Sequence, residues 1–217
     1  MNVLEIMERT GVVPVFYNGD AAVAANVVKA CYRGGIRTFE FTNRGEKAFE
    51  VFSALVRMAA GECPGLVMGI GSIVSAADCR RFVEAGARFV VGPVFSAEVM
   101  AEAALLGVPY IPGAATPTEV FNAWKAGAKI VKVFPAAEVG GPSFVKAVLA
   151  PMPWLRIMVT GGVEPTRENL SKWFAAGVRC VGIGSNLFPG ELVDAGRWDE
   201  MADDIARTLA VVAELKA

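Results

Sequence analysis

The segment Ile130-Val131-Lys132-Val133-Phe134-Pro135 has the composition of a β-strand that is buried on both faces, apart from its lysine. Seven other short apolar runs alternate with segments whose apolar residues recur at helical spacing. This alternation predicts a parallel sheet, because parallel neighbours need a crossover connection. The candidate strands are residues 12–17, 36–42, 66–71, 89–92, 108–112, 130–135, 156–160 and 180–184.

A short repeat favours closure of this sheet into a barrel. A glycine, an apolar residue and a basic residue recur at 35–37, 86–88, 127–129 and 177–179, each time between a helix and the next strand. We expect the glycines to end helices, where a left-handed backbone costs little only for glycine. Their spacing gives a βα unit of roughly 25 residues, which fits a (β/α)₈ TIM barrel with residues 1–217 as a single domain. A doubly wound sheet is the alternative.

The predicted helices lie between the strands. The segments with the clearest helical spacing are residues 21–32, 46–60, 76–84 and 118–125, and residues 201–215 are expected to form an amphipathic closing helix.

Composition narrows the function to small-molecule chemistry. The 217 residues are 54% hydrophobic with a formal net charge of −1, which does not suggest a nucleic-acid or polybasic membrane surface. No apolar run reaches membrane-spanning length and the amino terminus lacks a signal-peptide pattern, so a cytoplasmic protein is expected. Four isolated cysteines and the absence of histidine exclude serine–histidine and cysteine–histidine nucleophile pairs and histidine-ligated metals. We expect no metal and no cofactor.

Lys132 is the most informative residue. An isolated ammonium is costly to bury, so a lysine in an apolar strand tends to lose its proton and become an amine nucleophile. A neutral lysine can form a Schiff base with a carbonyl substrate. The alternatives are a lysine that extends to the surface at a strand end or that pairs with a carboxylate.

Polar residues gather where the predicted strands end, which is where barrels carry their active sites. Glu40, Thr42 and Arg44 share one parity of a strand, so a carboxylate and a guanidinium can converge near Lys132. Glu40 can alternatively serve only to neutralise Lys132, and Arg44 can be a solvated loop charge. The glycine-rich turns 160–162 and 182–185 suit a phosphate, because glycine lets backbone N–H groups approach its oxygens.

Together these segments resemble a known family. The runs 39–44, 69–72, 111–113, 131–136, 160–162 and 184–185 are similar, in the same order, to class I 2-keto-3-deoxy-6-phosphogluconate and 4-hydroxy-2-oxoglutarate aldolases. The resemblance implies metal-independent cleavage of a small-molecule keto acid, usually phosphorylated, into pyruvate and an aldehyde. It also implies a homotrimer.

The resemblance assigns roles residue by residue. Lys132 matches the Schiff-base lysine, Glu40 the general acid and base, and Arg44 the residue that holds the pyruvate carboxylate. The remaining positions match substrate contacts, and Gly161, Gly162 and Ser185 among them match the phosphate end. The full set is Ser72, Pro93, Phe134, Thr160, Gly161, Gly162, Gly184 and Ser185.

Three positions depart from the family pattern. Ser72 stands where many members have threonine, residues 92–96 replace a Ser-Pro-Gly turn, and residues 16–18 lack the basic residue that some members place near the substrate.

The sequence leaves two other functions open. One is a phosphate-binding isomerase or synthase with Glu40 as base, and the other is a non-catalytic ligand-binding barrel.

Overall fold

The computed structural model describes residues 2–217, and Met1 lies outside the described residues. The strands are β1 (Val12–Phe16), β2 (Thr38–Thr42), β3 (Val67–Gly71), β4 (Val90–Val91), β5 (Tyr110–Ile111), β6 (Gly113–Ala114), β7 (Val131–Val133), β8 (Ile157–Thr160) and β9 (Cys180–Ile183). The helices are α1 (Val3–Thr10), α2 (Ala21–Arg33), α3 (Ala48–Glu62), α4 (Ala76–Glu84), α5 (Ala97–Leu105), α6 (Pro117–Lys125), α7 (Gly141–Leu149), α8 (Arg167–Ala175), α9 (Gly190–Asp194) and α10 (Trp198–Lys216), with a 3₁₀ turn at Ser185–Leu187.

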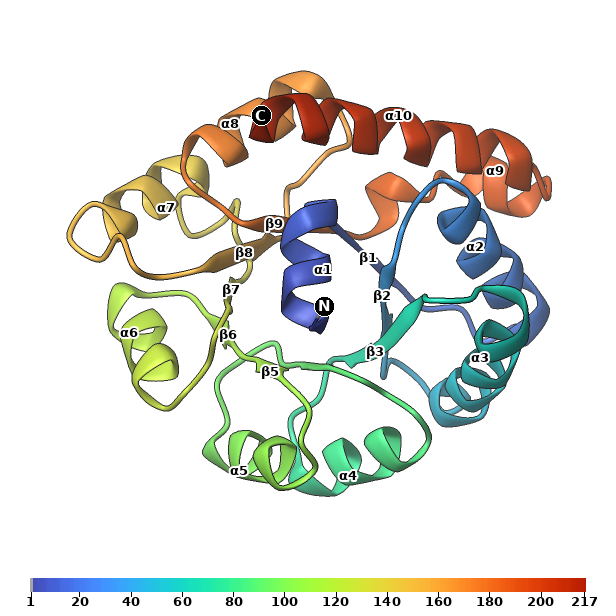
Figure 1. Ribbon diagram of the computed structural model, residues 1–217, viewed down its shortest axis with the longest axis horizontal. Coiled ribbons are helices and arrows are strands. Elements are labelled where there is room, and N and C mark those ends of the chain that lie inside the picture. The colour runs from blue at the N-terminus through green and yellow to red at the C-terminus, as the bar shows by residue number, and fades with distance from the viewer. Residues whose placement is uncertain (1) are drawn as a thin grey trace.

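All strand pairs are parallel, and their order β5-β4-β3-β2-β1-β9-β8-β7-β6 runs around a ring (Figure 1). The ring is completed through the chain itself, because β5 and β6 are separated only by Pro112. The predicted fifth strand, residues 108–112, is present only as β5, and pairing resumes beyond the predicted range as β6, since Pro112 has no N–H to donate to the ladder. This arrangement confirms the TIM barrel and rules out the doubly wound alternative.

The predicted helix ends are also confirmed. Gly35, Gly86, Gly127 and Gly177 have φ angles of 104°, 113°, 112° and 98°, and each stands two residues after the last residue of its helix. The closing helix α10 starts and ends slightly outside the predicted residues 201–215 and packs against α2 and α8. Within residues 2–217, none of the helices has the length and apolar character needed to cross a bilayer.

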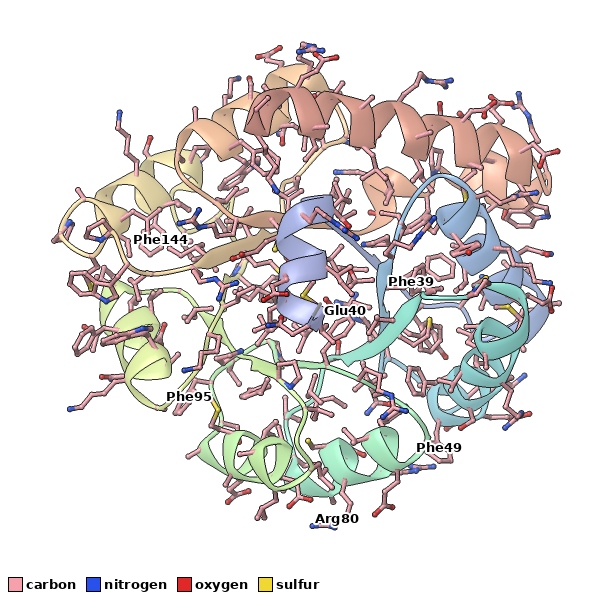
Figure 2. All side chains as sticks on the ribbon, in the orientation of Figure 1. Phe39, Glu40, Phe49, Arg80, Phe95 and Phe144 are labelled. Atoms are coloured by element: carbon pink, nitrogen blue, oxygen red, sulfur yellow. The ribbon has the colours of Figure 1, made fainter. Side chains whose placement is uncertain are left out.

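Side chains alternate between two apolar layers. Phe39 and Phe41 of β2 pack in the core between barrel and helices, whereas Glu40 points into the barrel (Figure 2). A second cluster fills the barrel interior and contains Val13, Phe89, Val91, Ile111, Ile130, Met158 and Cys180.

Helix α1 closes one end of the barrel, because its Leu4 and Met7 belong to the interior cluster (Figure 1). The other end, where the strands finish at their carboxyl termini, is left for the site.

Candidate active site

Lys132 lies inside the barrel. Its neighbours Val131 and Val133 pack in the layer beneath the helices, so strand alternation turns Lys132 to the interior. Its side chain is buried, with 5% of the residue exposed, and it pairs in register with Gly113 and Met158. The surface-extending alternative for this lysine is wrong.

Glu40 enters the same interior from β2 and is 1% exposed. Its carboxylate lies directly over Gly71 of β3, where a Cβ would be only 2.0 Å from Glu40 Oε1. Glu40 Oε2 has no hydrogen-bond partner, and among residues 2–217 no ion pair within 4.0 Å joins Glu40 to Lys132. A simple neutralising pair is thus not what the geometry displays, and a buried oxygen is left available for a ligand or water.

Burial dominates the electrostatics of these two groups. It raises the pKa of the Glu40 carboxyl and lowers the pKa of the Lys132 amine. The positive charges of Lys132 and Arg44 oppose the rise at Glu40. At Lys132 the negative charge of Glu40 opposes the fall, while Arg44 adds to it. The site therefore favours an uncharged amine beside a carboxyl group that holds its proton more tightly than usual.

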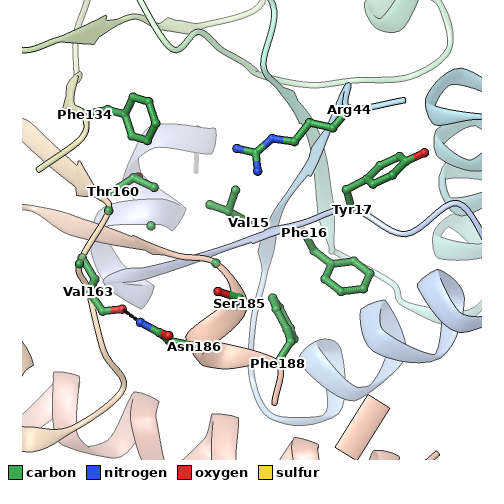
Figure 3. Close-up of a pocket in the computed structure, with 14 residues that line it drawn as sticks. Val15, Phe16, Tyr17, Arg44, Phe134, Thr160, Val163, Ser185, Asn186 and Phe188 are labelled. Carbon is green, nitrogen blue, oxygen red and sulfur yellow. Dashed lines mark hydrogen bonds between the residues drawn. The ribbon is translucent and has the colours of Figure 1, made fainter. Parts of the chain in front are cut away.

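Arg44 stands above this pair on the segment that leaves β2. Its Nε donates to Ser72 Oγ at 3.3 Å, and its guanidinium extends into the cavity toward Phe134 (Figure 3). Ser72 adopts a φ of 62°, uncommon for a residue other than glycine, at the end of β3. The two residues bring a cation and a hydroxyl to the mouth of the barrel.

A cavity of about 470 Å³ opens at the carboxyl ends of the strands. Its lining is Val15, Phe16, Tyr17, Arg44, Phe134, Thr160, Gly161, Gly162, Val163, Gly182, Gly184, Ser185, Asn186 and Phe188. Seven of these lining residues were predicted as site residues, namely Arg44, Phe134, Thr160, Gly161, Gly162, Gly184 and Ser185. Lys132, Glu40 and Ser72 are not part of the lining. Lys132 Nζ nevertheless lies 5.0 Å from the ring centre of Phe134, which is a lining residue.

The turn after β8 contributes an unpaired hydroxyl and a glycine pair. Thr160 Oγ1 is buried without a hydrogen-bond partner and lies against Gly182, where a Cβ would be 2.3 Å away. Gly161 and Gly162 have φ angles of 98° and 70°, which only glycine adopts readily. In the part of the chain that the structure describes, neither glycine N–H donates a hydrogen bond, so both can serve a ligand.

Pro93 is a fourth predicted site residue outside the cavity lining. Its carbonyl oxygen presses on Gly113, where a Cβ would be 2.0 Å from it. Since Gly113 pairs with Lys132, Pro93 packs against the strand next to the lysine.

Sequence reasoning missed the walls formed by Phe16, Phe188 and Asn186. Phe16 and Phe188 pack edge to face with ring centres 4.9 Å apart. Asn186 Nδ2 donates to the Val163 carbonyl at 3.0 Å, as Figure 3 shows. Their positions were the available signal, because Phe16 ends β1 and the other two follow β9, and barrel sites lie at strand ends and in the loops after them.

Comparisons with known proteins agree on one family. A family model for KDPG and KHG aldolase matches residues 3–203. The chain is 32% identical over 212 residues to the 2-dehydro-3-deoxy-phosphogluconate aldolase of Treponema pallidum (strain Nichols), which covers 98% of both chains. It is 35% identical over 169 residues to the probable 2-dehydro-3-deoxy-6-phosphogalactonate aldolase of Rhizobium meliloti (strain 1021), covering 77% of both.

A solved structure of a KDPG aldolase also matches this chain. The KDPG aldolase from Legionella pneumophila, with pyruvate captured at low pH as a covalent carbinolamine intermediate, matches with a TM-score of 0.84 and 26% identity. The match covers 94% of this chain and 96% of that one.

Proposed function

Because the chain belongs to the KDPG and KHG aldolase family, we propose that it cleaves 2-keto-3-deoxy-6-phosphogluconate, 4-hydroxy-2-oxoglutarate or both through a Schiff base on Lys132. The products are pyruvate and an aldehyde, glyceraldehyde 3-phosphate or glyoxylate respectively. The assignment of Lys132 rests on the burial of its amine beside the buried Glu40. Lys132 is 5% exposed inside the barrel, and burial lowers the pKa of its amine.

The first step is attack of the Lys132 amine on the keto carbon of the substrate. Only the uncharged amine has the lone pair for this attack, and burial favours that form. Glu40, whose raised pKa keeps a proton available, donates it to the departing hydroxyl of the carbinolamine, and water leaves. A protonated imine results.

The second step breaks the bond between C3 and C4. Glu40, now a carboxylate, removes the proton of the C4 hydroxyl, directly or through water. The electron pair of the breaking bond moves into the imine, which becomes an enamine, while C4 becomes the aldehyde. Protonation of C3 and hydrolysis of the imine then release pyruvate and the free lysine.

The cavity orients the substrate for both steps. The Arg44 guanidinium holds the carboxylate, for which its paired donors are suited, and the Thr160 hydroxyl supplies a further contact beside the imine. Phe134 packs next to the lysine. The N–H groups of Gly161 and Gly162, with Gly184 and Ser185, hold the other end of the substrate.

Trapping with borohydride tests the chemistry. Protein incubated with pyruvate and then reduced should gain the mass of one reduced pyruvate, located on Lys132. Lys132→Ala should lose both the adduct and pyruvate release from the substrate. Lys129→Ala removes an exposed lysine three residues earlier and should retain both. An adduct that survives Lys132→Ala would remove Lys132 from the mechanism.

The same trapping separates the alternative functions. An isomerase or synthase that uses Lys132 only as a charge forms no reducible imine, and neither does a non-catalytic barrel. Family membership does not favour these alternatives.

The remaining expectations stay predictions. We propose one aldolase domain over residues 1–217, a cytoplasmic location and a homotrimer, the last supported by exposed apolar surface that another copy can cover. Phe121, Trp124 and Trp154 form such a cluster, with successive ring centres 5.7 and 6.0 Å apart. Light scattering on the purified protein gives the oligomeric state directly.

A further inference from the structure

The turn after β8 has two successive backbone carbonyls that are held from the same side. The Ala136 N–H donates to the Thr160 carbonyl at 2.9 Å. The Ala137 N–H donates to the Gly161 carbonyl at 3.2 Å. Both donors lie on the segment after β7, and the φ of 98° at Gly161 lets the two carbonyls turn toward it together.

A third carbonyl of this turn is held by Asn169, the third residue of α8. Asn169 Nδ2 donates to the Gly162 carbonyl at 3.2 Å, and its Oδ1 accepts from the Glu164 N–H at 3.0 Å. The opposite assignment of the amide would lose both bonds, so its orientation is fixed chemically. One side chain therefore spans residues 162–164 from outside the cavity, whose lining does not include Asn169.

These three bonds set the direction of three backbone N–H groups. A trans peptide unit is planar, with its C=O and N–H on opposite sides, so the N–H that follows each held carbonyl points away from the group that holds it. The N–H groups of Gly161 and Gly162 thus point away from the segment after β7, and that of Val163 points away from α8. All three residues line the cavity, and within residues 2–217 none of these N–H groups donates a hydrogen bond. Successive N–H groups of this kind form a concave site for an anion.

Val163 is fixed on its other side as well. Asn186, in the 3₁₀ turn after β9, donates from Nδ2 to the Val163 carbonyl at 3.0 Å (Figure 3). The two peptide units that flank Val163 are therefore each held by a side-chain amide. Of the two amides, Asn169 determines where the Val163 N–H points, because the carbonyl that it binds belongs to the same peptide unit.

We propose that Asn169 is a positioning residue for the phosphate end of the substrate, and that it holds the Gly162–Val163 peptide unit so that the Val163 N–H becomes a third phosphate donor beside Gly161 and Gly162. The inference rests on the proposed function and adds no step to it, because Asn169 contacts neither Lys132 nor the substrate. Without the Asn169 amide this peptide unit can rotate, and the phosphate loses one charge-assisted hydrogen bond.

The test compares Asn169→Ala with the wild type on 2-keto-3-deoxy-6-phosphogluconate and on the unphosphorylated 2-keto-3-deoxygluconate. A hydrogen bond to a charged group contributes roughly 10- to 100-fold, so KM for the phosphate ester should rise about tenfold while kcat changes less than threefold. Both constants for the unphosphorylated acid should stay within threefold of the wild type, because it has no phosphate to bind. A KM for the phosphate ester within threefold of the wild type, or an equal loss for both acids, overturns the proposal.

Two further variants separate the amide from a general effect on α8. Asn169→Leu has a side chain of similar size without donor or acceptor and should reproduce the rise in KM, whereas a wild-type KM would contradict the role of the amide. Ser171→Ala, two residues later, removes a hydroxyl that donates to the Glu168 carbonyl at 2.9 Å and should leave both substrates unaffected. A rise in Ser171→Ala equal to that in Asn169→Ala would show that any disturbance of α8 suffices and would overturn the proposal.

Borohydride trapping with pyruvate, done on the same samples, reports the proposed function separately. Pyruvate carries no phosphate, so Asn169→Ala should form the Lys132 adduct as the wild type does, with a similar melting temperature. Failure of the wild type to form the adduct refutes the aldolase chemistry. A normal adduct together with an unchanged KM for the phosphate ester in Asn169→Ala refutes only the role of Asn169.

Discussion

Gly71 gives the Glu40 carboxylate its place, and Gly71→Ala should displace that carboxylate without unfolding the barrel. A Cβ at Gly71 would be 2.0 Å from Glu40 Oε1, and real Cβ atoms essentially never approach within 3.0 Å, so the oxygen has to move about 1 Å. Gly71 is not among the glycines with positive φ, and alanine therefore fits its backbone. The strain falls on the end of the Glu40 side chain.

A displacement of about 1 Å in a reacting group can lower the rate about 100-fold, equivalent to about 2.7 kcal/mol of activation free energy. We expect Gly71→Ala to lower kcat by this order, with little change in KM because Arg44 and the cavity are intact. The assay is pyruvate release under saturating substrate, with the melting temperature measured on the same sample.

Gly61 offers the matched control. It lies in α3 with no atom within 4 Å of an added Cβ, so Gly61→Ala should leave kcat unchanged and stabilise the helix by roughly 0.5–1 kcal/mol. If Gly71→Ala retains its melting temperature and its kcat stays within threefold of the wild type, Glu40 is not the proton-transfer group at that position.

Three other outcomes follow from the same geometry. Because burial lowers the pKa of Lys132, the uncharged fraction of its amine rises as the pH climbs through that lowered value. Trapping of pyruvate should therefore increase with pH at values clearly below 10.5, where an ordinary lysine titrates. A rise only near 10.5 would contradict a buried amine. Arg44→Lys should raise KM roughly tenfold with a smaller effect on kcat, since an ammonium cannot hold a carboxylate through two parallel hydrogen bonds, and an unchanged KM would show that Arg44 does not bind the substrate. Gly69→Ala should lower the free energy of unfolding by about 1–3 kcal/mol, because its Cβ would lie 2.3 Å from the Phe89 ring inside the barrel; urea denaturation measures this, and wild-type stability would refute it.

Strand alternation let the sequence predict much of the fold and half of the site. Residues 38–42 alternate between phenylalanines that pack under the helices and polar residues that point inward, so the inward position of Glu40 follows from its parity alone. Lys132 was identified from the apolar character of its strand, with a surface position left open, and the structure places it in the interior, where burial lowers its pKa. These predictions needed only the strand period and the rule that barrel sites lie at strand carboxyl ends.

The sequence could not predict contacts between residues on different strands, because such contacts form only when the barrel is assembled. The contact between the Glu40 carboxylate and Gly71 joins two strands, and the contact between the Pro93 carbonyl and Gly113 joins the turn after β4 to β6. Neither contact has a local sequence pattern. The resemblance names Pro93 only as a substrate contact, and the packing of its carbonyl against the strand beside Lys132 has no counterpart in the sequence pattern.

The segments after β1 and β9 show why chemistry and substrate choice separate in this fold. Lys132 and Glu40 lie on strands, and their positions follow from the hydrogen-bond register of the barrel. Tyr17, Asn186 and Phe188 lie on the segments after β1 and β9, so they can change without moving the lysine. A substitution at Asn186 should therefore alter how the cavity accepts the far end of the substrate while the imine on Lys132 still forms.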